Sequence, residues 1–118
     1  MEDRRSKPRL TVSLDAVWDS TTGRQSARIT NLSEGGCYLD TVGETLSGEI
    51  VCFRLLMPNH DDWLYLEGEV RHYTPGVGFG VRFTDLNEEQ KEKIALLIKT
   101  AREAGVNATP LSADLIQD

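Results

Sequence analysis

Apolar and polar residues alternate over several short stretches of the chain, and turn-forming residues separate these stretches. In residues 10–18 every second residue is apolar, which is the period of a strand with one buried face. Alternation, or a short apolar run that stops at a turn, recurs over residues 24–30, 37–40, 49–57, 63–73 and 77–83. Six short strands predict a mainly β fold, a closed or nearly closed antiparallel barrel, because closure removes unpaired sheet edges.

The hydrophobic period lengthens after Leu86, which predicts a helix. Asn87 and Gln90 have the spacing of a capping box at its start. The apolar residues that follow fall on one helical face, and they are Ile94, Leu97, Ile98 and Ala101. We expect this face to pack on the barrel, with partner recruitment as the alternative, and we expect Gly105 to cap the end of the helix.

The length of 118 residues suits one compact domain. We divide it into a flexible arginine-rich arm over residues 1–9, the barrel and helix over 10–105, and a loose tail over 106–118. The sequence has no apolar run of the roughly 18 residues that span a bilayer and no apolar signal core near its start. These features predict a cytoplasmic protein without membrane insertion.

Charge is distributed unevenly along the chain. The formal net charge is −6, yet residues 4–9 hold four basic side chains and no acid. The other residues therefore hold nine basic against nineteen acidic side chains. A broad basic face for nucleic acid is excluded by this balance, and a short basic arm is better suited to a small, compact anion.

The two cysteines and two histidines are too scattered to suggest a metal site. Cys37 and Cys52 lie in apolar strand-like runs, so we interpret both as reduced core residues and not as disulfide partners. His60 and His72 lack ligand spacing with them. We predict no metal, no cofactor and, because no nucleophile–base pair is evident, no enzymatic activity.

Two short motifs carry the candidate chemistry. The first, residues 5–9, reads RSKPR and places two arginines four positions apart beside a proline that favours an extended path. The second, residues 31–36, reads NLSEGG and lies between two predicted strands. RxxxR followed by [DN]xSxxG, a GVRF run at residues 80–83 and a terminal helix resembles the PilZ family over about residues 4–103.

The PilZ resemblance implies a six-stranded barrel that binds the bacterial second messenger cyclic di-GMP. It implies that the arginine arm closes over ligand held at the NxSxxG turn, with regulation of motility or biofilm formation through an unidentified protein effector. The matching positions are Arg5, Arg9, Asn31, Ser33 and Gly36. A PilZ-like adaptor that acts by protein contact alone is the alternative function.

The residue types suit this ligand, which has two phosphodiester anions and two guanines. A guanidinium can grip phosphate oxygens or the O6/N7 edge of guanine with two parallel hydrogen bonds. Asn31 and Ser33 offer donors and acceptors side by side, with Leu32 between them directed to the core. Arg4 adds a third guanidinium, which predicts an intercalated pair of ligand molecules at high concentration.

Each motif also has a plainer interpretation. The arginines could form only a solvated basic tail, and Asn31, Ser33 and Gly36 could only make a turn. Glycine at position 36 allows either a close approach of the ligand or a positive φ. Trp18, Trp63 and the GVRF strand are interpreted as core and hairpin packing rather than as ligand contacts.

Overall fold

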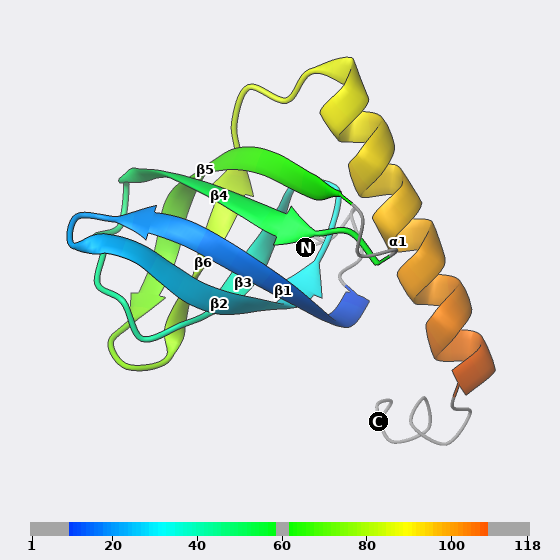
Figure 1. Cartoon of the computed structure of the whole chain (residues 1–118), viewed down its shortest axis with the longest axis horizontal. Coiled ribbons are helices and arrows are strands. Elements are labelled where there is room, and N and C mark those ends of the chain that lie inside the picture. The colour runs from blue at the N-terminus through cyan, green and yellow to red at the C-terminus, as the bar shows by residue number, and fades with distance from the viewer. Residues whose placement is uncertain (1–9, 59–61, 109–118) are drawn as a thin grey trace, which may run out of the picture.

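The structure, a computed structural model, describes residues 10–58 and 62–108. Within them the strands close into one barrel in the order β1-β2-β3-β6-β5-β4, with antiparallel neighbours throughout (Figure 1). The elements are β1 (Leu10–Ser20), β2 (Gly23–Leu32), β3 (Gly36–Asp40), β4 (Ile50–Leu56), β5 (Trp63–Thr74), β6 (Gly78–Phe83) and α1 (Glu88–Ala108). The predicted six-stranded antiparallel barrel with a C-terminal helix is confirmed.

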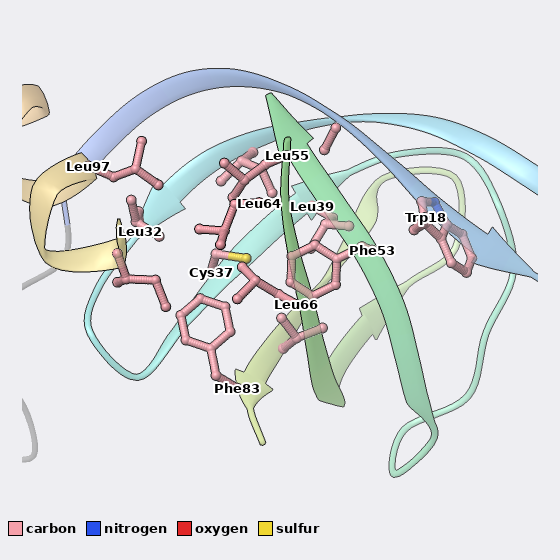
Figure 2. Packing of buried hydrophobic residues seen from close by; sticks show 14 of the residues in the cluster. Trp18, Leu32, Cys37, Leu39, Phe53, Leu55, Leu64, Leu66, Phe83 and Leu97 are labelled. Atoms are coloured by element: carbon pink, nitrogen blue, oxygen red, sulfur yellow. The ribbon is translucent and has the colours of Figure 1, made fainter. Parts of the chain in front are cut away.

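The inward-facing residues of the six strands fill the barrel. Ile29, Leu39 and Leu55 are completely buried, and Figure 2 shows side chains from opposite strands meeting in one cluster. Trp18 packs its edge against Phe79, with ring centroids 4.9 Å apart. Its predicted core position is confirmed.

A loop after β3 holds the indole of Trp18 in place. Trp18 Nε1 donates a hydrogen bond of 3.0 Å to Thr41 Oγ1, and that hydroxyl donates to the carbonyl of Ser26 at 2.9 Å. The buried N–H is therefore satisfied, as a buried indole usually requires. These bonds fix the β3–β4 connection across one end of the barrel.

The helix α1 runs beside the other end of the barrel (Figure 1). The predicted capping box is present: the Asn87 N–H donates to Gln90 Oε1, and the Gln90 N–H donates to Asn87 Oδ1, both at 2.8 Å. Ile94, Leu97 and Ile98 join the core cluster, so the apolar face packs on the barrel as expected. In the described residues, no helix is long and apolar enough to cross a membrane.

The end of the helix differs from the prediction. Gly105 does not cap α1, because the helix continues through it to Ala108. A glycine inside a helix costs about 1 kcal/mol but keeps its backbone N–H, so it does not by itself end the helix. Pro110, two residues further on in the sequence, is a stronger terminator.

The prediction of two core cysteines is correct for one and wrong for the other. Cys37 is buried in β3, and burial raises the pKa of its thiol, which therefore stays protonated. Cys52 is exposed. It follows buried Val51 and precedes buried Phe53 on β4, so the period of two directs its side chain outward. Because most residues of 50–57 are apolar, this alternation could not be recognised in the sequence.

Candidate functional site

The NxSxxG segment forms the turn from β2 to β3. Leu32, the last residue of β2, is completely buried, as predicted. The Ser33 N–H donates to the Gly36 carbonyl at 2.9 Å, and Ser33 Oγ accepts from the Gly35 N–H at 3.3 Å. With Ser33 only 8% exposed, its hydroxyl stabilises the turn from within.

Gly36 is required by the close approach of two strands. A β carbon at this position would overlap the backbone carbonyl oxygen of Val81 on β6. Gly36 is not among the described glycines with positive φ, so the left-handed conformation that the sequence suggested is not the reason for glycine here. Its absent side chain lets β3 pair with β6 next to the turn.

A cavity of about 470 Å³ opens beside this turn on the outer surface of β3, β6 and β5. Ser33 and Gly36 line one end of it. Four further side chains in the lining lie outside the RxxxR and NxSxxG motifs, and they are Tyr38, Arg71, His72 and Arg82. Arg82 belongs to the GVRF run, which the sequence had indicated only as packing. The cavity therefore combines the predicted turn with two guanidinium groups and two rings.

A row of three residues forms the floor of the cavity. Gly80 on β6 pairs with Tyr38 on β3 and with His72 on β5. A β carbon at Gly80 would lie 3.7 Å from Tyr38 Cδ1 and 4.0 Å from His72 Cδ2, so a ring stands on each side of the glycine. This slot between the rings can accept a flat aromatic group.

A β-bulge directs two neighbouring side chains of β5 outward. Val70 pairs with Val81 and His72 pairs with Gly80, which leaves Arg71 as the extra residue. Both Arg71 and His72 are exposed. Strict alternation would have turned His72 inward beside Val70, which is why the sequence pattern did not indicate it.

The electrostatics of the cavity favour an anion. Arg82 Nη2 lies 3.2 Å from Glu69 Oε1, whereas Arg71 forms no ion pair within the part of the chain that the structure describes. Burial, and then the negative charge of Asp40, raise the pKa of Tyr38, so its hydroxyl remains a donor at neutral pH. Arginine and tyrosine donors thus surround a partly enclosed space.

The three predicted arm residues, Arg4, Arg5 and Arg9, lie outside the described residues. The point where the arm joins the barrel is nevertheless fixed. Leu10 pairs with Leu32, and Thr11 pairs with Asn31. The chain therefore enters the barrel directly beside the NxSxxG turn.

Two other sequence interpretations concern metals and Trp63. Across residues 10–58 and 62–108, no group of three His, Cys, Asp or Glu side chains could hold a metal ion. His60 is outside this part of the chain. Trp63 is half-buried on the outer surface, where the guanidinium carbon of Arg54 lies 5.1 Å from its ring centroid.

Comparison with known proteins identifies the family. A sequence profile of the PilZ domain matches residues 3–100. The chain therefore belongs to the PilZ domain family, whose members are binding and regulatory domains rather than enzymes. No curated protein gives a significant sequence match to the chain.

Solved structures share the fold at low sequence identity. The PilZ domain of YcgR from Escherichia coli, solved with c-di-GMP, has a TM-score of 0.76 and 14% identity over 92% of this chain and 100% of that chain. The Bacillus subtilis inhibitor of motility MotI has a TM-score of 0.71 and 18% identity over 90% of this chain. K. pneumonia MrkH in complex with c-di-GMP has a TM-score of 0.73 and 13% identity over 92%. The chain spans 53% of MotI and 56% of MrkH.

Proposed function

We propose that this protein binds cyclic di-GMP in the cavity beside the NxSxxG turn. The observation that carries the proposal is the meeting of three features on one surface: the turn at Ser33, the cationic cavity lined by Arg71 and Arg82, and the entry of the chain at Leu10. Membership of the PilZ family and the c-di-GMP complexes of the structural neighbours YcgR and MrkH support it.

Each part of the ligand has a suitable partner in the cavity. A guanine fits the slot between Tyr38 and His72, where stacking on both faces is favourable. Arg71, without an ion-pair partner in the described residues, can grip a phosphate or the O6/N7 edge of guanine with two hydrogen bonds. Asn31 does not line the cavity, but it pairs with Tyr38, which does, so its amide offers a donor and an acceptor beside the cavity.

The arm begins beside the NxSxxG turn, which supports its approach to the cavity. Consecutive Cα atoms are 3.8 Å apart, so Arg9 stays next to Leu10, and Arg5 stays within about 18 Å of it. Leu10 is itself paired with Leu32 in the motif. Arg5 and Arg9 can therefore close over a ligand in the cavity, and Arg4 supplies a third guanidinium.

Ligand binding would order the arm and change a surface that a protein effector reads. Ordering the arm costs conformational entropy, which charge-assisted hydrogen bonds must offset. Binding should consequently weaken as salt concentration rises. We propose that this regulation takes place in the cytoplasm and acts on motility or biofilm formation.

An adaptor that works without nucleotide is the second candidate. Two observations favour it: the Ser33 hydroxyl is engaged inside the turn, and Gly36 is required by the pairing of β3 with β6. Both motif residues thus have structural roles that do not need a ligand. Only a binding measurement separates the two functions.

Isothermal titration of the full-length protein with cyclic di-GMP, and with GTP as comparison ligand, tests the proposal. We expect micromolar binding of cyclic di-GMP that is lost in Arg5→Ala and Arg9→Ala and weakened in Ser33→Ala. Arg24→Ala is the matched control, because Arg24 pairs with Asp19 near the β1–β2 turn, away from the cavity. No heat of binding with the wild type would leave the adaptor function, and equal heats for wild type and the arm variants would exclude a role of the arm in binding.

The same titration counts the ligands. Three guanidinium groups in the arm exceed the two phosphates of one ligand, so we expect two molecules per chain at saturation. A stoichiometry of one ligand per chain would contradict the intercalated pair and leave the binding proposal intact.

A further inference from the structure

A second row of side chains crosses the outer surface of the barrel on β1, β4 and β5. Val17 pairs with Arg54, and Arg54 pairs with Tyr65. Trp63, two residues before Tyr65, lies on the same face of β5. We call Val17, Arg54, Trp63 and Tyr65 the Arg54 patch. It shares only β5 with the cavity, whose β5 residues lie at the other end of that strand.

The charge at the centre of this patch has no acidic partner in the described residues. The guanidinium carbon of Arg54 lies 5.1 Å from the ring centroid of Trp63 and 5.8 Å from that of Tyr65. Its Nε is buried and makes no hydrogen bond within that part of the chain. By contrast, Arg24 and Arg28 on β2 are paired, with Asp19 and Asp15 on β1. The positive charge of the Arg54 guanidinium is therefore not neutralised within the described residues, and a partner carboxylate could neutralise it.

The apolar surface continues beyond the patch. Tyr65 is 62% exposed, although large aromatic side chains are usually covered. Next to it, a shallow groove of about 530 Å³ crosses β1 and β2. Val17, Trp63 and Val42, which is 74% exposed, are among the residues that line this groove, together with the charged residues Asp15, Arg28 and Asp40.

We propose that the Arg54 patch and this groove bind a protein partner that presents a carboxylate beside an apolar side chain. The carboxylate pairs with Arg54, and the apolar side chain enters the groove between Trp63 and Val42. Arginine, tryptophan and tyrosine are the residues that dominate binding energy at protein interfaces. Their neighbouring rings also shield the guanidinium from water, which strengthens a charge pair.

Charge decides between this partner and other occupants. A two-fold contact with a second copy would bring one Arg54 patch against another, so that like charges meet. A nucleic acid is disfavoured because the net charge of the protein is −6. A single partner carboxylate meets the positive charge of Arg54 and carries far less negative charge than a nucleic acid, so the net charge of −6 opposes it less. The inference does not depend on cyclic di-GMP binding.

The test uses a displayed library of random linear peptides, selected on the full-length wild-type protein. Negative selection on a variant with Arg54→Gln and Trp63→Ala retains only peptides that need the patch. We expect the retained peptides to share an Asp or Glu next to an aliphatic or aromatic residue. Thermal unfolding confirms that the variants are folded, and Arg24→Gln is the control for loss of a surface arginine.

Fluorescence anisotropy of one retained peptide then isolates the charge pair. Arg54→Gln should weaken binding by roughly tenfold or more, and so should replacing the acid of the peptide by its amide. The two changes together should cost little more than either alone, because they remove the same contact. The Arg24→Gln control should bind like wild type.

Three results would overturn the proposal. The selection could retain no peptide, or peptides without a common acid. The two changes could prove additive, so that the acid does not contact Arg54. Sedimentation could reveal a dimer of the protein that Tyr65→Ser abolishes, which would assign the patch to a second copy.

Discussion

The cavity and the Arg54 patch each contain a row of three residues that pair across neighbouring strands, but the residue at the centre of the row differs. In each, three paired residues cross three neighbouring strands, with an aromatic residue at one end. The middle residue is Gly80 in the row of the cavity and Arg54 in the row of the patch. The glycine leaves a slot between the rings of Tyr38 and His72, whereas the arginine covers Trp63 and Tyr65.

From this comparison we propose that the two faces of the barrel serve two kinds of partner. In our proposal, the slot between the two rings receives a flat group, and Arg71 and Arg82 beside it grip an anion. A row filled by arginine presents one charge beside aromatic rings, which suits another protein. The residue at the centre of the row therefore decides which partner each face can take.

The largest effect should come from a glycine at the edge of the cavity. Gly36→Ala places a β carbon against the backbone of Val81, so β3 and β6 must separate. We expect a loss of about 3 kcal/mol in the free energy of unfolding, measured by urea denaturation. Gly80→Ala is the control, because its β carbon has ordinary contacts and the cost should stay below about 1 kcal/mol. Equal costs at both positions would contradict the close approach at Gly36.

The second prediction concerns the slot at Gly80, which the Arg54 patch lacks, and filling this slot should weaken ligand binding. Gly80→Leu puts a side chain between Tyr38 and His72 without touching the core. We expect cyclic di-GMP affinity to fall by about 2 kcal/mol, roughly thirtyfold, because one guanine loses its stacking site. Calorimetry measures this, with the urea midpoint as the check on folding. Wild-type affinity in Gly80→Leu would exclude the slot as the base site.

A somewhat smaller loss of ligand affinity is expected from a substitution of Arg71, the extra residue in the bulge of β5. Arg71→Ala removes a guanidinium from the cavity and should cost about 1.5 kcal/mol of ligand affinity, roughly tenfold. Arg71→Lys keeps the positive charge but cannot make two parallel hydrogen bonds, so it should recover only part of the lost ligand affinity. The salt dependence of binding should become shallower in Arg71→Ala. An unchanged affinity would show that Arg71 does not contact the ligand.

The smallest effect should appear at the Arg54 patch. Arg54→Leu loses cation–π contacts worth about 0.5–1 kcal/mol each. It also removes a buried donor without an acceptor, which offsets part of that loss. We expect the free energy of unfolding to change by less than about 1 kcal/mol and cyclic di-GMP affinity to remain that of wild type. A loss of ligand affinity in this variant would show that the two faces are coupled.

The strands, the barrel and the capping box followed from local patterns. Alternation located each strand to within a few residues, and the pair Asn87 and Gln90 located the start of α1. Errors arose where a pattern was ambiguous. Cys52 stood in an apolar run that masked the period of two, and Gly105 was given a role in ending the helix that it does not have.

For the candidate site, the sequence indicated one part of the lining and not the rest. The NLSEGG segment is a recognisable turn, so Ser33 and Gly36 could be chosen from the chain alone. His72 could not, because a bulge decides that it faces outward like its neighbour Arg71, which alternation alone directs outward. The sequence also could not indicate why position 36 is a glycine. The reason is the close approach of the Val81 carbonyl oxygen, which belongs to a strand some forty-five residues away in the chain.

The sequence by itself determined which residues alternate, where the chain turns, and which family the order of motifs resembles, because these are properties of neighbours along the chain. Only the tertiary structure decided which strands pair and in which register. That register brings Leu10 beside Leu32, sets Gly80 between two rings and lays Arg54 over two others. Such contacts join residues far apart in the chain, and their geometry depends on barrel closure and bulges that no local pattern contains.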